Sequence, residues 1–349
     1  MAKTYFSTSN DLTKKIFSES LYRDAKKESY FSKFVSSSAD NIVHERTELS
    51  KDKGDEVTIG LRLRLTGTGV EEGTQLEGNE EALATHAMKV LLKQYRHAVR
   101  DSGAMTRRRP AFDISEESVM ALKDWMSEKV DQLHFDALGV GSGSTASENP
   151  TKLFYKTSAG VLSTGTFATA KSALTVADSK LSLNMISFLK TYALTGGARS
   201  VIPIRPVKID GKPYFVLLTH PDAVYDLRAD SSFQQAMREA EVRGKENPLF
   251  SGAVAIWNGV VVHEHESVVI GADAGSTTNV PFAKASLLGA QSLCLAYGKR
   301  PELVQDQFDY FDQIGHAMSV IMGVKKSKFD SKDYGSVGVL LSRTNVSGA

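Results

Sequence analysis

The 349-residue sequence has little cysteine and no long apolar run. Its one cysteine, Cys294, excludes an internal disulfide framework, and the flanking Leu293 and Leu295 indicate a buried, inert thiol. No segment approaches the roughly 18 consecutive apolar residues of a membrane-spanning helix, and residues 1–10 lack the charged-then-apolar pattern of a secretory signal. We therefore expect a protein that is synthesised and folds in a reducing cytoplasm, without a membrane partner.

An excess of either charge is also missing. The sequence has 42 basic and 41 acidic residues, which leaves a formal net charge of +1. This balance excludes a global basic field that would attract nucleic acid or an anionic membrane. A chain of this length buries a sizeable core and is expected to split into more than one lobe.

Motifs typical of catalytic or metal-binding sites are scarce. The conspicuous cluster is His263-Glu264-His265-Glu266, and on a strand its two histidines would face one side, as a pair of metal ligands does. A metal-dependent hydrolase using His263 and His265 needs further ligands and an open coordination position, but none of the other six histidines is paired with these in sequence. We therefore interpret both as polar outer positions of a half-exposed strand that tolerate replacement by Asn, and keep the hydrolase as a lesser alternative.

The glycine-rich segment 139–143 lacks the features of a phosphate-binding loop. It follows a predicted helix rather than a strand, and no Walker lysine follows it. No G-x-S-x-G nucleophile motif occurs either. The sequence does not look like that of an enzyme, so we expect no catalytic residue, no cofactor and no metal.

Basic residues gather locally between 89 and 109. The triplet Arg107, Arg108 and Arg109 follows four spaced basic residues, Lys89, Lys93, Arg96 and Arg100. Such a patch contacts nucleic-acid phosphates in some proteins, and it could equally neutralise an acidic loop at 71–81. A nucleic-acid-binding protein that uses 89–109 is therefore the other alternative function.

The most regular element is a long helix over residues 113–139. Asp113 is a good N-cap with Glu116 three residues later, and glycines at 139, 141 and 143 end the helix. Its length is about 40 Å at about 1.5 Å per residue. Its core-facing stripe is expected to contain Leu122, Trp125, Met126, Val130 and Leu133. We expect Trp125 to be buried against a sheet, so that Trp125→Ala costs about 3–5 kcal/mol.

A hairpin arm is expected before this helix. Residues 55–65 alternate apolar and polar side chains at period two, and 66–81 are rich in glycine and glutamate. The period of residues 85–100 is ambiguous between helix and strand, and we favour a return strand that completes the hairpin. An isolated two-stranded arm is marginal in water, so its row Leu61, Leu63 and Leu65 is expected to pack on an adjacent subunit.

Residues 1–50 also have too few apolar side chains to form a core. Leu12 and Ile16 mark an amphipathic helix, and Phe31, Phe34 and Val35 form a separate apolar cluster. This arm must lie either on its own body or on a neighbour.

The remainder is expected to mix helices and strands without a regular βαβ repeat. We predict helices at 178–195, 232–243 and 281–297, hairpins that turn at Asp210-Gly211 and Asn258-Gly259, and strands at 307–323 and 335–342. In the helix at 178–195, the inward side chains are Leu181, Met185, Phe188, Leu189 and Tyr192. The fold class is α+β.

Short motifs recur along the chain in a specific order. They are Leu76-Glu77-Gly78-Asn79-Glu80-Glu81, Arg96-His97-Ala98-Val99, Phe112-Asp113, Leu122 with Trp125, Arg205-Pro206, Asn247-Pro248-Leu249-Phe250 with Gly252, Leu288-Gly289-Ala290-Gln291, Asp309-Tyr310, and Gly323 with Lys325, Lys326 and Phe329. Together they resemble the major capsid (coat) proteins of one group of short-tailed bacteriophages, over about residues 30–342.

The resemblance implies the α+β fold of tailed-phage coat proteins. Its parts would be an N-terminal arm at 1–50, an extended hairpin termed the E-loop at 51–100, and a P domain at 101–175 built on a spine helix at 113–139. An A domain at 176–300 would follow, and residues 301–349 would return to the P domain and the C-terminus. In this fold, the two arms lie across neighbouring subunits.

The resemblance also implies a structural function. The protein would assemble into pentamers and hexamers of an icosahedral shell that encloses the double-stranded DNA genome of the virion, and assembly would take place in the bacterial host cytoplasm. Implied partners are other copies of the chain, a separate scaffolding protein, a portal, possible decoration proteins and packaged DNA. Arg62 and Arg64 could then meet Glu71, Glu72 and Glu77 of a neighbouring arm, and Arg107, Arg108 and Arg109 could contact the genome or an acidic partner.

Overall fold

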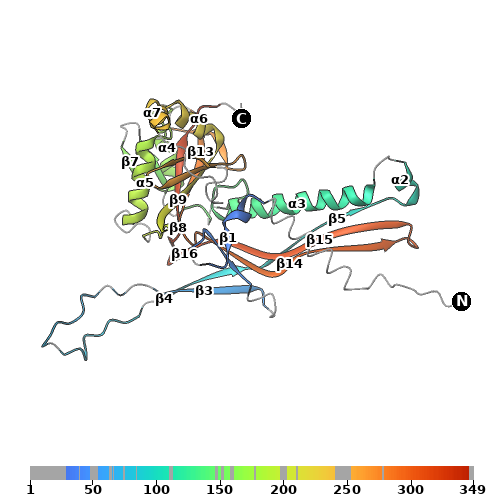
Figure 1. The fold of residues 1–349 in the computed structure, drawn as a ribbon, viewed down its shortest axis with the longest axis horizontal. Coiled ribbons are helices and arrows are strands. Elements are labelled where there is room, and N and C mark those ends of the chain that lie inside the picture. The colour runs from blue at the N-terminus through green and yellow to red at the C-terminus, as the bar shows by residue number, and fades with distance from the viewer. Residues whose placement is uncertain are drawn as a thin grey trace.

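The computed structural model describes most of the chain between residues 29 and 345. The described ranges are 29–38, 40–47, 54–62, 65, 67–73, 75–83, 85–109, 113–145, 148–150, 153–157, 161–176, 178–196, 203–209, 211–239, 253–276 and 279–345. The predicted helix at Leu12 and Ile16 lies outside them. A globular lobe, a long helix-and-sheet lobe and a protruding hairpin point in three directions (Figure 1). Within these ranges, no helix is long and apolar enough to cross a membrane.

The long helix is present as predicted. Helix α3 spans Ile114–Ala137, and the Asp113 side chain caps it by accepting a 2.8 Å hydrogen bond from the Ser115 amide. The chain leaves the helix at Gly139, whose φ of +79° favours glycine, and a Cβ there would meet the Glu148 carbonyl oxygen at 2.7 Å. Both ends of the helix are therefore encoded by local residues.

Helix α3 lies along a five-stranded sheet (Figure 1). The strand order is β1 (Val35–Ser36), β2 (Val43–Arg46), β14 (Leu293–Phe308), β15 (Gln313–Lys326) and β5 (Lys93–Arg100). Leu122 and Met126 are buried in the core between helix and sheet, whereas Trp125, Val130 and Leu133 are partly buried at its margin. Trp125 lies over His97 of β5, with the ring centroids 5.0 Å apart. The prediction that Trp125 is buried against the sheet holds only in part, because this side of α3 overhangs the exposed edge strand and leaves the ring partly buried.

The position of Trp125 lowers the expected cost of its truncation. Trp125→Ala should destabilise the protein by about 2 kcal/mol, since a half-buried ring loses only part of its packing. Leu122→Ala is the matched control at a fully buried position and should cost about 2–5 kcal/mol. Urea denaturation of both variants measures the difference. A midpoint unchanged by Trp125→Ala would show that the ring contributes no packing energy.

The globular lobe is built on a mixed nine-stranded sheet. Its main path is β10 (Ala253–Trp257), β11 (Val260–Glu264), β9 (Lys212–Thr219), β13 (Val280–Leu288), β18 (Ser336–Ser342), β6 (Leu153–Lys156) and β7 (Leu162–Gly165), with β12 (Ile270–Ala274) paired to β13 and β8 (Val207–Ile209) to β9. Helices α4 (Phe167–Ala173), α5 (Leu183–Thr195), α6 (Pro221–Ala229) and α7 (Ser231–Glu239) surround it. One face of the sheet shares a core with α5 and α6, and the other shares a core with α3.

The helix predicted at 281–297 is wrong. This segment forms β13, a turn and the start of β14, and every residue from 283 to 288 is buried. A continuous apolar run has the composition of a strand buried on both faces as well as that of a buried helix, so periodicity alone does not separate them. Helix α5 also begins later than predicted, and Phe188 is 41% exposed rather than inward.

Both predicted hairpin turns are present. Gly211 connects β8 to β9 with a φ of +77°, and Asn258 and Gly259 connect β10 to β11 with φ of +47° and +75°. Helix α7 matches the prediction at 232–243 in its first part, whereas α6 was not predicted from the sequence. The strands predicted at 307–323 and 335–342 correspond to the end of β14, β15 and β18.

Lys284 of β13 connects the two lobes. Its ammonium donates to the Gly139 carbonyl beyond the C-terminus of α3 and to the Asn149 side chain, both at 3.2 Å. A cation in this position complements the negative end of the helix dipole. Burial of the side chain lowers the pKa of Lys284.

The described part of the N-terminal arm lies on its own body. The single-turn helix η1 (Tyr30–Phe34) packs on α3, with Phe31 and Phe34 buried. Strand β2 then adds to β14 in parallel. Of the two surfaces that the sequence left open for the cluster at 31–35, the structure therefore supports the subunit's own core.

Candidate functional site

A hairpin projects from the junction of the two lobes (Figure 1). Strands β3 (Glu56–Arg62) and β4 (Thr85–Leu91) pair in antiparallel register, from Glu56 opposite Leu91 to Arg62 opposite Thr85. They form a separate two-stranded sheet that, in the described residues, has no strand pairing with either large sheet. The loop beyond Arg62 and Thr85 extends furthest from the body, so the hairpin presents a surface that its own subunit does not cover.

The base of the hairpin is anchored in its own subunit. Val57, Met88 and Val90 form a buried cluster with Cys294 and Phe329, and Lys325 Nζ donates to the Lys89 carbonyl at 2.8 Å. A Cβ at Gly323 of β15 would meet the Leu91 carbonyl oxygen at 2.2 Å, so this crossing requires glycine. Ile59 and Leu61 also pack on this cluster. The expectation that the apolar row packs on a neighbour is therefore wrong for Leu61, whereas Leu63 lies outside the described residues. Cys294 is buried as predicted.

The predicted return strand at 85–100 is two strands. Residues 85–91 form β4 of the hairpin, whereas residues 93–100 form β5, which pairs with β15 in the five-stranded sheet. Strand was the correct choice over helix for the whole segment. Only the part before Leu92 belongs to the hairpin, so a hairpin that extends from 51 to 100 is too long.

The far part of the hairpin is exposed and acidic. Leu65, Leu76 and Leu83 are 62%, 61% and 60% exposed. The carboxylate side chains at 71, 72 and 77 are exposed as well, as is Arg62, whereas Arg64 lies outside the described residues. Large exposed leucines on a segment that carries several carboxylates are typical of a surface awaiting a partner.

The basic residues do not form one patch. Lys89 pairs with Glu56 at 2.6 Å on the hairpin. Arg107, at the end of α2 (Ala104–Arg108), forms an ion pair with Asp101 and donates to the Asp312 carbonyl at 2.9 Å, so its guanidinium is engaged within the subunit. Arg108 and Arg109 are exposed, as are Lys93, Arg96 and Arg100 along β5.

Helix α2 and the hairpin loop lie at opposite ends of the molecule (Figure 1). The acidic loop at 71–81 therefore does not neutralise Arg107, Arg108 and Arg109 of the same subunit. Of the two interpretations left open for these arginines, the contact with an external partner remains for Arg108 and Arg109.

A second exposed feature was missed by the sequence analysis. The turn between β14 and β15 carries Tyr310 and Phe311, which are 99% and 64% exposed. Asp309, Tyr310 and Phe311 all have positive φ, of +49°, +49° and +72°, and such conformations are costly for residues other than glycine. The sequence signal was the run Asp309-Tyr310-Phe311-Asp312, which interrupts the strand pattern with two aromatics between two carboxylates.

The interpretation of His263 as an outer strand position is wrong. His263 is 0% exposed, because η1 covers this face of β11 and the Phe34 ring meets the imidazole edge-on at 5.6 Å. His265 is partly buried against Tyr30, with ring centroids 4.6 Å apart. Across the ranges described above, no group of three or more His, Cys, Asp or Glu is placed to hold a metal ion.

The chain matches known proteins over nearly its full length. The sequence profile of the family described as Phage capsid protein matches residues 6–340. The major capsid protein of Pseudomonas phage KPP25 is 29% identical over an alignment of 377 positions, gaps included, and the alignment covers 97% of this chain and 97% of that protein.

Solved structures agree with this match. The capsid of Ralstonia phage GP4 superposes with a TM-score of 0.77 at 26% identity and covers 91% of this chain and 92% of that one. The capsid asymmetric unit of cyanophage Pam1 superposes with a TM-score of 0.76 at 25% identity, with 91% and 93% covered. They confirm the α+β coat-protein fold expected from the sequence. Because the family profile spans almost the whole sequence, the chain belongs to the phage capsid protein family.

Proposed function

We propose that copies of this chain assemble into rings of five and six subunits, and that these rings close into the icosahedral shell of a phage head. The chain is a structural shell protein and not an enzyme, in keeping with its family. The observation that carries the proposal is the projecting hairpin, whose far end exposes Leu65, Leu76 and Leu83 at one extremity of an otherwise well-packed subunit.

The charges of the subunit favour a head-to-tail contact. The acidic far end of the hairpin lies at one end, whereas the exposed basic side chains of β5 and α2 run toward the other. Two different, complementary surfaces on one molecule generate a heterologous contact, which closes into a ring when the rotation per subunit permits. We infer that the hairpin of one subunit lies across the helix-and-sheet lobe of the next.

Electron microscopy of the purified protein tests the proposal. Alone or with its cognate scaffold, the protein should form pentameric and hexameric rings and closed shells. A chain that stays strictly monomeric at high concentration in the presence of scaffold would refute the proposal.

The exposed arginine of the hairpin gives a more specific prediction. Arg62→Glu, alone and with Arg64→Glu, should leave circular dichroism and thermal unfolding unchanged, because the Arg62 side chain is exposed. Shells should fail to form or become salt-sensitive, since the substitution replaces attraction to Glu71, Glu72 and Glu77 of a neighbouring hairpin with repulsion. Assembly yield at 50 mM to 500 mM salt would be measured by sedimentation.

Lys208→Glu is the matched control, because it makes the same charge change at an exposed position on β8 of the globular lobe. Normal shells at every salt concentration would mean that Arg62 is only solvated surface. Loss of the folded subunit would mean that the arginine supports the subunit's own fold.

Further partners follow from the same proposal. We propose a separate scaffolding protein, a portal and decoration proteins as partners, and packaged double-stranded DNA on the inner surface. Arg108 and Arg109 are the exposed candidates for a phosphate or acidic-protein contact. Assembly would take place in the cytoplasm of the bacterial host, and the final location is the virion.

A further inference from the structure

The arm segment 29–34 lies on a surface that is unusually rich in histidine. Each of its three aromatic side chains meets a different imidazole: Phe31 meets His134, Tyr30 meets His265 and Phe34 meets His263, with ring centroids 4.8, 4.6 and 5.6 Å apart. These are three of the eight histidines of the sequence. His134 comes from α3, and His263 and His265 come from the end of β11 and the residue after it, so two distant parts of the chain converge under one short segment.

The backbone of the same segment is held by one carboxylate. Asp131 of α3 accepts hydrogen bonds from the amides of Tyr30, at 2.7 Å, and Phe31, at 3.2 Å, and from the hydroxyl of Ser29. Charge-assisted bonds of this kind are stronger than neutral ones. The segment is therefore docked by burial of Phe31 and Phe34 in the main core, by ring contacts with the histidines and by Asp131, with no sheet contact along residues 29–34.

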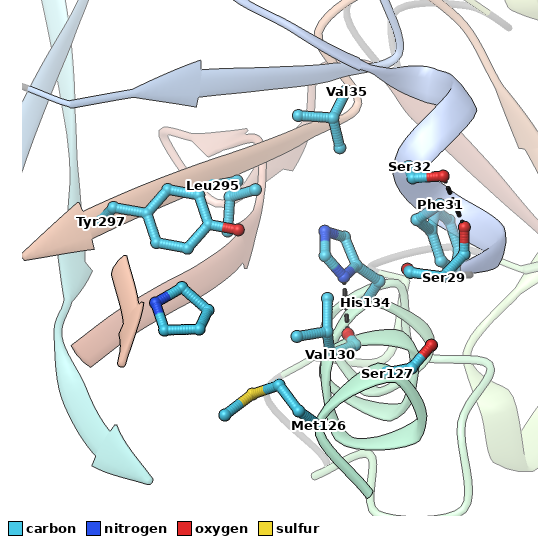
Figure 2. A pocket seen from close by; sticks show the side chains of 11 residues that line it. Ser29, Phe31, Ser32, Val35, Met126, Ser127, Val130, His134, Leu295 and Tyr297 are labelled. Carbon is cyan, nitrogen blue, oxygen red and sulfur yellow. Dashed lines mark hydrogen bonds between the residues drawn. The ribbon is translucent and has the colours of Figure 1, made fainter. Parts of the chain in front are cut away.

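His134 is buried with one nitrogen facing an apolar pocket (Figure 2). Its Nδ1 lies 2.7 Å from the Val130 carbonyl oxygen. Because a carbonyl oxygen can only accept a hydrogen bond, Nδ1 carries the proton and Nε2 is unprotonated. Within the described residues, Nε2 has no hydrogen-bond partner. The pocket around it is lined by the arm and by β14, including Val35 and Tyr297. A second proton on His134 would point into this mostly apolar pocket, where no acceptor of the described residues lies within hydrogen-bond distance of Nε2.

The charged groups around the two titrating histidines oppose one another. Asp131, on the same helix as His134, raises the pKa of both His134 and His265, and Glu266 also raises that of His265, whereas Lys33 of η1 lowers that of His265. The other titratable side chains near this site are Tyr30 of η1, Tyr297 of β14 and His263 of β11. Desolvation by burial outweighs these charges, so the pKa values of His134 and His265 both lie below the ordinary value.

We propose that this docking site is an acid-released latch, in which protonation of His134 and His265 frees the arm segment Ser29–Phe34 from the spine helix α3. The direction of the pH effect follows from the linkage between proton binding and docking. With the arm released, a histidine titrates near pH 6.5, and with the arm docked it titrates at a lower pH. The released form therefore binds more protons, so docking is strongest above about pH 6.5 and weakens as the pH falls.

Each histidine can shift the docking equilibrium by up to about tenfold per pH unit between its two pKa values. This inference goes beyond shell assembly, because it concerns one subunit and is measured on the unassembled full chain. The segment 29–34, once released, would be available to a neighbour.

Amide hydrogen exchange tests the latch directly, because the amides of Tyr30 and Phe31 donate to Asp131. Protection factors, corrected for the intrinsic pH dependence of exchange, are compared at pH 7.5 and pH 5.5. The wild-type protein should lose at least tenfold protection at these amides, and the variant His134→Leu with His265→Gln should lose less than twofold. His86→Gln, on β4 and away from the site, is the matched control and should behave like wild type.

Two results would overturn the latch: equal wild-type protection at both pH values, or a loss that persists in the double variant. Asp131→Asn should lose protection at both pH values, and retained protection there would also contradict the proposal. If the double variant does not fold, His265→Gln alone at its partly exposed position should still reduce the loss. An unchanged loss in that variant would count against the latch.

Discussion

A chain in which residues 63–84 are replaced by Asn-Gly is expected to fold normally and to form no shells. The replacement joins Arg62 to Thr85, which are the last paired residues of the hairpin, through a two-residue turn that suits antiparallel strands. The base of the hairpin keeps its buried cluster around Val57, Met88 and Val90. The substitution therefore removes the exposed far end and leaves the packed part intact.

Circular dichroism and urea denaturation should show an unchanged subunit, and electron microscopy should show no closed shells. Two full-length controls separate the contribution of the side chains at the far end from the contribution of its length. One carries Leu65→Ser, Leu76→Ser and Leu83→Ser, and the other carries Glu71→Gln, Glu72→Gln and Glu77→Gln. Normal shells from the shortened chain would mean that the far end of the hairpin is not an assembly contact.

The largest effect on subunit stability is expected for Asp333→Ala. The Asp333 carboxylate pairs with the Lys326 ammonium at 2.7 Å, and their side chains are only 1% and 3% exposed. Residues around this pair connect β15, the short strands β16 (Lys328–Phe329) and β17 (Lys332–Asp333), and the base of the hairpin. Removing one member leaves the other charge buried, which typically costs about 3–5 kcal/mol.

Two comparisons make this result specific. Lys326→Met with Asp333→Leu removes both charges and should restore most of the stability, because an apolar pair avoids the desolvation cost. Asp273→Ala breaks the Lys171–Asp273 pair, which has a similar distance of 2.6 Å but lies on the surface, and should leave the urea midpoint unchanged. A urea midpoint of Asp333→Ala equal to that of the wild type would contradict this prediction. It would mean that buried Lys326 becomes neutral without a loss of stability.

The features that were predicted correctly depend on residues close together in the sequence. The boundaries of α3 follow from the cap at Asp113 and the glycine at 139, and the turn at Asn258 and Gly259 follows from a dipeptide. The fold class and family were accessible as well, because motifs in a fixed order extend over most of the chain. The hairpin could be predicted because its alternating strand lacked any visible core.

The incorrect predictions concern residues whose contact partners are distant in the sequence. Strand β5 pairs with β15 more than 200 residues later, so the hairpin could not be limited to residues before Leu92 from local pattern. His263 occupies an outward position on β11 by alternation, but the arm segment around Phe34 covers that face. Periodicity describes which side of a strand a residue occupies and does not state what lies against that side.

The sequence by itself therefore determined the helix ends, the turns, the strand alternation and the presence of a hairpin before the long helix. Only the tertiary structure decided which surface each segment meets: the hairpin base on Phe329, the arm segment on Asp131 and three histidines, and Lys326 against Asp333. The physical reason is that caps and turns are set by the backbone conformation of a few neighbours. Burial and charge pairing depend on groups that chain folding brings together from positions far apart in the sequence.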